Sequence, residues 1–303
     1  MRIKLCGLVA WVAILVAGLV SCQQEEISQS LQYPILFGYS DTRAVADLGD
    51  LKNDGFKVYA YFEGNTNNYA TFEKEVAYDE DKNVWGYQGL ESWIPGATYW
   101  FKAVYPKAIG SVEYASQSSP ILKIENFDIS SQTDLLVAEA GPLTVDPVLG
   151  APGSGSVVSL QFKHLLANVS VMVKSEISDV KVKTITFANV ANKGNLDGND
   201  WSSNEETTLT KSMEVSLDKD VDFVDVTDGG FLVIPQGIDG SKQKLCIETS
   251  HKIYNDITIP KITWESGKRY AYTLIIKQEN IVFNEPTVEE WDEENATGSV
   301  IIK

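Results

Sequence analysis

A short run of oxygen-bearing side chains, Asp79–Asn83, has the alternating spacing that a calcium-binding loop uses. In such a loop the sixth position needs glycine for a sharp turn, and the twelfth supplies a bidentate glutamate. Val84 and Leu90 occupy those two positions here. We therefore interpret Asp79–Asn83 as the polar tip of a hairpin, and we predict no metal site and no cofactor.

The residue types of hydrolytic catalysis are present but are not arranged for it. His164 and His251 are the only histidines, they are far apart in the chain, and neither has a metal-ligand spacing. No serine sits in a Gly-x-Ser-x-Gly turn, and no glycine-rich loop precedes a predicted helix. With 42 acidic residues, pairs of carboxylates at glycosidase separations will arise by chance. We predict that the chain is not an enzyme and that His164 has a structural role.

The residue with the clearest chemistry is Cys22. It follows a basic segment with Arg2 and Lys4, and an apolar stretch, Leu5–Leu19, that is short for a membrane-spanning helix. The four residues Leu19–Cys22 resemble the bacterial lipoprotein processing box, in which the cysteine thiol accepts diacylglycerol and becomes the new N-terminus. We therefore predict a lipoprotein signal peptide over 1–21 and lipidation at Cys22. The alternative is an ordinary signal peptide with an incidental cysteine.

A polar tether is predicted over residues 22–33. Its acidic run Gln23–Glu26 resembles the export signal of lipoproteins carried to the outer face of the outer membrane. A solvated tether would have the same composition, so both interpretations stay open. The expected location is the cell outer membrane, with the protein exposed at the surface.

Charge and cysteine content limit the function further. From Cys22 onward, 23 basic residues face 42 acidic ones, a formal net charge of −19. Nucleic-acid binding depends on lysine and arginine that neutralise phosphates, so we predict no nucleic-acid partner. After processing, Cys246 is the only cysteine left besides Cys22, which excludes an intrachain disulfide within the folded region. Its apolar neighbours predict a core position.

Alternation of apolar and polar residues predicts strands throughout the chain, with little helical periodicity. Clear examples are 56–62, 98–105, 158–162, 169–173 and 270–276. Turn signals separate them, and the glycine- and serine-rich stretch Gly150–Ser156 reads as a linker. We predict an all-β chain with two β-sandwich domains, over 34–150 and 156–303.

Several motifs, in this order, resemble the fimbrillins, or type V pilins, and in particular the minor-fimbria-like branch. They are Ile35-Leu36-Phe37, Thr42-Arg43-Ala44, Trp93-Ile94-Pro95-Gly96 with Tyr99–Pro106, Thr133–Ala138, Val158–Val173, Phe231–Gln236, Trp264–Leu274 and Ile281–Trp291. The resemblance implies two tandem transthyretin-like sandwiches and a role as a stalk, anchor or tip subunit of adhesive fimbriae. Its implied partners are other fimbrial subunits, and a host or bacterial surface ligand.

The resemblance also implies a mechanism of assembly. An arginine-specific protease would cut between Arg43 and Ala44 and release Cys22–Arg43 with the strand Ile35–Phe37. The opened sheet edge would then accept a strand from the next subunit, by donor-strand exchange. The candidate donor here is Ser299-Val300-Ile301-Ile302.

Three alternatives remain open from the sequence. Arg43 can equally be a plain loop residue. Only 12 residues follow Trp291, which favours an anchor, tip or accessory subunit that keeps its lipid. The third is a surface lipoprotein that binds glycans through exposed aromatic side chains, for which the candidates are Trp85, Tyr87, Trp93, Tyr99, Trp100 and Tyr105.

Overall fold

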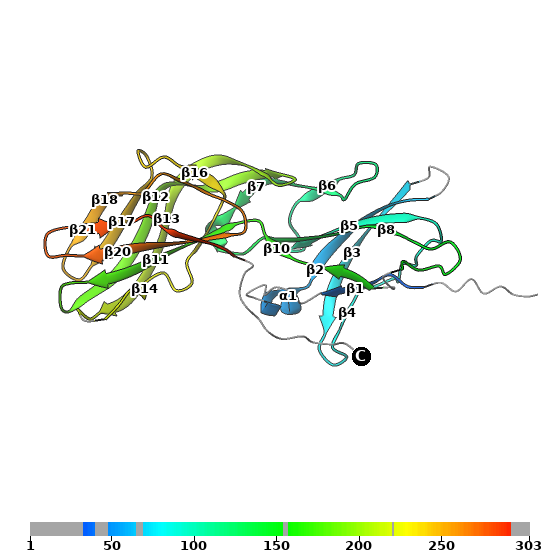
Figure 1. Cartoon of the computed structure of the whole chain (residues 1–303), viewed down its shortest axis with the longest axis horizontal. Helices are drawn as coiled ribbons and strands as arrows, with labels where there is room; N and C mark the ends of the chain where they lie inside the picture. Colours follow the sequence, from blue (N-terminus) through cyan, green and yellow to red (C-terminus); the bar gives the residue numbers. More distant parts are fainter. Residues whose placement is uncertain (1–32, 40–47, 65–68, 154–156, 220, 292–303) are drawn as a thin grey trace, which may run out of the picture. The chain divides into compact units, whose positions relative to one another are not determined.

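The computed structural model describes residues 33–39, 48–64, 69–153, 157–219 and 221–291 (Figure 1). Strands dominate these residues, and the regular helices among them are α1 (Leu48–Asp54) and one short 3₁₀ turn, Ile129–Ser131. The prediction of an all-β chain is confirmed. Helix α1 was not predicted, because seven residues are too few to establish a helical period.

A first hydrophobic core lies against a six-stranded sheet. In spatial order its strands are β10 (Lys163–His164), β8 (Leu136–Thr144), β5 (Thr98–Tyr105), β2 (Phe56–Glu63), β3 (Tyr69–Asp79) and β4 (Val84–Gly86). The other side of this core is formed by α1 and by the parallel pair β1 (Leu36–Tyr39) and β9 (Val157–Leu160). Strands β2 and β5 closely match the predicted runs, and β3 and β4 form a hairpin with Asp79–Asn83 at its turn, as predicted.

A second hydrophobic core is enclosed by two further six-stranded sheets. One contains β18 (Ile253–Thr258), β17 (Lys244–Thr249), β12 (Val180–Asp197), β7 (Ile121–Asp128) and β6 (Ser111–Glu113), with β13 (Asp200–Leu217) also paired to β12. The other contains β14 (Val224–Asp225), β11 (Ala167–Ser175), β20 (Lys268–Ile276) and β21 (Ile281–Phe283), with β15 (Phe231–Val233) on β11 and β22 (Thr287–Glu290) on β20. A separate pair is β16 (Gln236–Ile238) with β19 (Ile262–Trp264).

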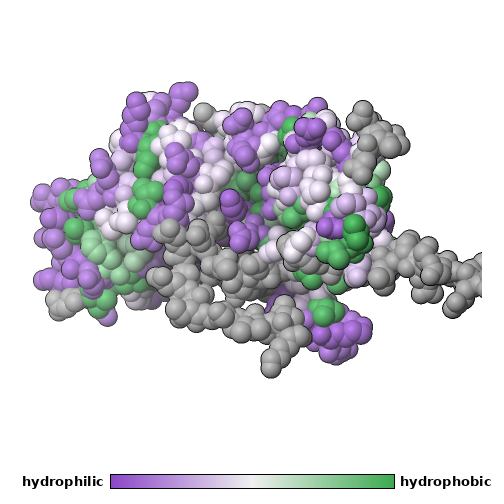
Figure 2. All heavy atoms as spheres, turned by 45° about the vertical axis from the view of Figure 1, so that its right-hand side comes forward, coloured by the Kyte–Doolittle hydropathy of each residue, from purple (hydrophilic) through white to green (hydrophobic). Residues whose placement is uncertain are grey.

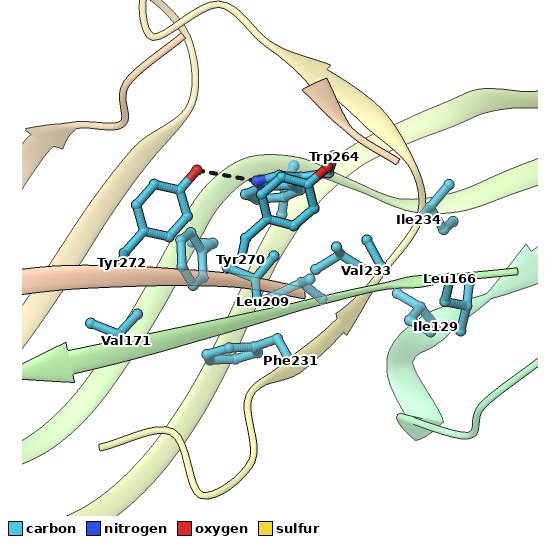
Figure 3. Close-up of a cluster of buried hydrophobic side chains, with 14 of the residues drawn as sticks. Ile129, Leu166, Val171, Leu209, Phe231, Val233, Ile234, Trp264, Tyr270 and Tyr272 are labelled. Carbon is cyan, nitrogen blue, oxygen red and sulfur yellow. Dashed lines mark hydrogen bonds between the residues drawn. The ribbon is translucent and has the colours of Figure 1, made fainter. Parts of the chain in front are cut away.

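The alternation of residue types explains why these sheets bury one face. Along β11, Val169, Val171 and Val173 are buried, and the residues between them are partly exposed. Because successive side chains of a strand point to opposite faces, this pattern directs every second residue into the core. Figure 3 shows the result: Val171, Phe231 and Tyr272 come from different strands and meet in one cluster.

Each core includes one strand from the opposite side of the predicted linker Gly150–Ser156. Strand β7 precedes the linker but pairs with β12 and contributes Leu122 and Ile124 to the second core. Strand β9 follows the linker but pairs with β1 and contributes Val158 and Leu160 to the first core. The chain therefore passes between the two cores three times, at 105–111, 131–136 and 164–167.

The prediction of a core position for Cys246 is wrong. Its neighbours Leu245 and Ile247 are buried, whereas Cys246 is partly exposed and its thiol donates to Asn255 Oδ1 at 2.9 Å. The apolar neighbours misled the prediction because a strand alternates its faces, so the residue between two core residues points outward.

Two core tyrosines predict a loss of stability in alkali. Burial raises the pKa of Tyr99 and of Tyr272 to about 12, from the ordinary value of 10. Between pH 10 and pH 12 the folded chain keeps phenolic protons that the unfolded chain has lost. The contribution of the two tyrosines to the free energy of unfolding is therefore fully present below pH 10 and is lost as the pH rises towards 12. Urea midpoints measured from pH 9 to 12 should decrease. The decrease should be smaller in Tyr99→Phe, and an equal decrease in that variant would contradict the assignment.

Candidate functional site

The segment Ile35–Gly38 places alternate side chains into the first core. Ile35 and Phe37 are buried, whereas Leu36 and Gly38 are partly exposed. The Phe37 ring packs 5.5 Å from the ring of Tyr87 and 5.7 Å from that of Phe101, measured between centroids. This short strand thus supplies two large apolar side chains to a core that is otherwise built from later parts of the chain.

The segment 33–39, which contains β1, is held by backbone hydrogen bonds on both edges. On one edge it runs parallel to β9, with Leu36 opposite Val157 and Tyr39 opposite Leu160. On the other edge, Ile35 N donates to Glu91 O at 2.8 Å, and Trp93 N donates to Tyr33 O at 2.9 Å. Segment 33–39 therefore fills a slot between β9 and residues 91–93, which we call the β1 slot.

One hydroxyl group links the wall of the β1 slot to the strand inside it. Tyr87 Oη donates to Ile35 O at 2.6 Å and accepts from Glu91 N at 3.2 Å. A phenol with the ordinary pKa of 10 is already protonated at neutral pH, and partial burial raises the pKa of Tyr87 further, so its hydroxyl is a donor. The slot therefore offers a backbone carbonyl, backbone amides and a hydroxyl to whichever strand occupies it.

The close approach of β1 to β9 requires a small residue at position 38. A Cβ atom on Gly38 would lie 2.7 Å from Val157 Cγ1, which is closer than real Cβ contacts. With Val157 in its present position, a strand that combines two large apolar side chains with a small residue next to β9 therefore fits this slot best. The pattern Ile35-x-Phe37-Gly38 meets both requirements.

The predicted processing sites lie outside the described residues. They are Cys22, Arg43, Ala44 and the candidate donor Ser299–Ile302. The described part of β1 ends at Tyr39, four positions before Arg43, so a cut after Arg43 would leave the whole of β1 on the released fragment.

A second cluster was not predicted as a unit. His164 Nδ1 lies 2.5 Å from Asp134 Oδ2, and the His164 ring stacks on Trp291 with 3.7 Å between centroids. Trp291 N in turn donates to Gly267 O at 2.7 Å. The cluster joins β10 to the end of β22, which gives His164 a structural setting. In the sequence, the only hint of this structural role is that His164 has apolar neighbours.

The six aromatic candidates for glycan binding pack mainly into the protein. Trp93, Tyr99, Trp100 and Tyr105 are buried, and Trp85 and Tyr87 are partly buried against the first core. Their rings contact one another and neighbouring phenylalanines at centroid distances such as 4.8 Å for Trp93 and Tyr99. These side chains are thus used for packing, and all six are at least partly buried.

Within the described residues, histidine, cysteine and acidic side chains do not gather into any group of three or more that could hold a metal ion. Over the same ranges, no helix has the length and hydrophobicity needed to cross a membrane.

Comparisons with known proteins agree with this architecture. Residues 42–291 match a family model described as fimbrillin-like. No curated protein sequence matches the chain. Among solved structures, a provisionally assigned cell adhesion protein from Bacteroides uniformis is 15% identical, with a TM-score of 0.54, and the match covers 87% of this chain and 99% of that one.

Two other structures are similar. A provisionally assigned cell adhesion protein from Bacteroides ovatus is 14% identical, with a TM-score of 0.52, over 79% of this chain and 88% of that one. The tip fimbrial protein Mfa3 from Porphyromonas gingivalis is 8% identical, with a TM-score of 0.42, over 78% of this chain and 94% of that one. At these identities the first two matches show a shared fold.

Proposed function

This chain belongs to the fimbrillin-like family, and from that membership we propose that it is a structural subunit of adhesive cell-surface fimbriae that is assembled by β-strand complementation. The family consists of structural proteins of fimbriae and not of enzymes, so the predicted membership and the predicted lack of enzymatic activity are both confirmed. The mode of assembly, the lipid anchor and the adhesion ligand belong to the proposal.

The observation that carries the proposal is the β1 slot. Its occupant is a short segment near the N-terminus whose side chains Ile35 and Phe37 are buried, and whose backbone is bonded on both edges. Removing it would expose an apolar groove together with the unpaired edge of β9, a combination that recruits another strand. A replacement strand would restore the same hydrogen bonds with Glu91 and Trp93.

Burial of apolar side chains supplies much of the energy for this contact. Burying the two large side chains that the slot accepts contributes roughly 3–6 kcal/mol before the cost of ordering the strand. We propose that an arginine-specific protease cuts after Arg43 and that the vacated slot accepts a donor strand from another subunit. Ser299–Ile302 is the candidate donor of this chain.

The anchor is the second part of the proposal. Cys22, which ends the sequence Leu19-Val20-Ser21-Cys22, carries the lipid that holds the precursor at the outer membrane. A subunit that keeps this lipid anchors the fimbria, and one that loses it by cleavage extends the polymer. The two roles differ in one measurable property, the N-terminal residue of the protein in the cell.

The N-terminus of the protein from native membranes and from sheared fimbriae should separate these roles. We expect Ala44 as the first residue in a polymerising subunit and acylated Cys22 in an anchor. Arg43→Ala should abolish any Ala44 terminus and leave Cys22 acylated, whereas Cys22→Ser should abolish incorporation of labelled palmitate. Material with neither terminus, and absent from fimbrial fractions, would contradict the proposal.

A further inference from the structure

A small exposed loop presents two aliphatic side chains to solvent. Val148 is 90% exposed and Leu149 is 66% exposed, and Ile94 on a neighbouring turn is 47% exposed. On the face seen in Figure 2, hydrophobic patches interrupt a largely hydrophilic surface. Single exposed aliphatic residues are common, so the grouping needs further support before it indicates a binding surface.

The loop is held in a fixed shape that keeps these side chains outside. Asp146 Oδ1 accepts from Val148 N at 2.7 Å and from Leu149 N at 2.8 Å, and Gly150 N donates to Asp146 O at 2.9 Å. The two backbone amides lower the pKa of Asp146, so its carboxylate stays charged and bonded at neutral pH. The loop therefore cannot simply fold its valine and leucine back onto the sheet without breaking these bonds.

The loop and the turn that carries Ile94 are joined by backbone bonds. Gly96 N donates to Val145 O at 3.0 Å, and Val145 N donates to Ala97 O at 2.8 Å. We call residues 93–97 and 146–153 together the apolar tip. Of these 13 residues Asp146 is the only charged one, whereas a chain with 22% charged residues would place about three among them. The depletion of charge makes the tip unlike the rest of this acidic protein.

The apolar tip lies where the N-terminal tether joins the described part. Tyr33 is the first described residue, and its carbonyl accepts from Trp93 N, within the tip, at 2.9 Å. Pro34 forms a bridge with Ser92 directly beside it. A chain anchored through Cys22 is thus attached to its anchor at the tip. The 11 residue steps from Cys22 to Tyr33 span at most about 40 Å when fully extended.

We propose that the apolar tip docks onto the lipid bilayer to which Cys22 is attached, and that Ile94, Val148 and Leu149 enter its interfacial layer. This inference rests on the lipidation of Cys22 in the proposed function. The short tether keeps the tip at a high effective concentration near the membrane, so a weak apolar contact is enough to orient the subunit. The net charge of −19 on the chain from Cys22 onward disfavours contact with anionic head groups, which leaves the tip, with its single charge, as the favoured point of contact.

The test uses residues 23–303 with an N-terminal polyhistidine tag, bound to phosphatidylcholine vesicles that contain a nickel-chelating lipid. An environment-sensitive fluorophore is attached at Val148→Cys in a Cys246→Ser background, and the vesicles carry nitroxide-labelled lipid as quencher. The matched control is Val221→Cys, since Val221 is also an exposed valine, at 46%, but lies before β14 near the second core.

We expect lipid quenching to reduce the emission at position 148 by about twofold, and to leave position 221 unchanged, because only the tip enters the interfacial layer. The additional substitutions Ile94→Ser and Leu149→Ser should remove most of this quenching while the circular dichroism spectrum stays the same. No quenching at position 148, or equal quenching at both positions, would overturn the inference.

Two further outcomes are informative. A change at position 148 that depends on protein concentration without vesicles would assign the tip to contact between copies of the chain, and would also overturn the inference. Because the tag replaces the lipid, the vesicle result does not depend on acylation in the cell. Failure of palmitate incorporation at Cys22 would instead reject the proposed anchor, so the two failures are distinguishable.

Discussion

Replacing Phe37 with alanine is expected to lower the free energy of unfolding by about 3–5 kcal/mol. The Phe37 ring is buried in the β1 slot against Tyr87 and Phe101, and its removal leaves a cavity that the surrounding strands cannot easily close. Urea denaturation of the uncleaved chain, 23–303, followed by circular dichroism, measures the effect. Such a loss is a large part of the stability of an ordinary domain.

The matched control is Leu36→Ala on the same strand. Leu36 faces away from the first core and is only partly buried, so its replacement should cost much less than that of Phe37. A Phe37→Ala variant with the same stability as Leu36→Ala would mean that β1 contributes little to the core. The proposal that its loss opens a strand-accepting groove would then lose its physical basis.

The second large effect is expected at Trp264, a fully buried residue of the second core. Trp264 is fully buried, packs edge-on against Phe187 at 5.9 Å, and its Nε1 donates to the hydroxyl of Tyr272 at 3.1 Å (Figure 3). Trp264→Ala should cost about 3–5 kcal/mol, because it removes the largest fully buried side chain in the structure. Thermal and urea unfolding of the variant measure this loss.

Tyr272→Phe separates the hydrogen bond from the packing. It keeps the ring but removes the acceptor of the Trp264 N–H, which should cost about 1–3 kcal/mol because that donor is left buried without its partner. The order of stability should therefore be wild type, then Tyr272→Phe, then Trp264→Ala. A Trp264→Ala variant more stable than Tyr272→Phe would show that the second core repacks around the missing indole.

The strands themselves could be predicted from the sequence to a large extent. The alternating runs 56–62 and 98–105 match β2 and β5 almost to their ends, although β5 is buried on both faces from Tyr99 to Tyr105 and β2 is buried over most of its length. The exchange of β7 and β9 between the cores could not be predicted. Residues 150–156 have the composition of a linker, and composition reports local flexibility, not which sheet the neighbouring strands join.

Only the strand of the candidate site, and not its partners, could be predicted from the sequence. Ile35-Leu36-Phe37 could be identified as a strand, and Gly38 follows it directly. Its partners could not be found, because β9 lies about 120 positions further along the chain and the other edge is an irregular segment around Trp93. Contacts between segments so far apart leave no periodic signal in a single sequence.

The three passages of the chain between its cores have a mechanical consequence for a subunit of a fimbria. A pull that enters near Tyr33, beside the first core, and leaves near Trp291, in the second, is divided among three covalent crossings instead of falling on one linker. To draw the halves apart, tension would have to strip β7 from β12 as well as β9 from β1. Such a subunit is expected to resist tension as one mechanical unit, because its two cores cannot separate while β7 and β9 stay paired.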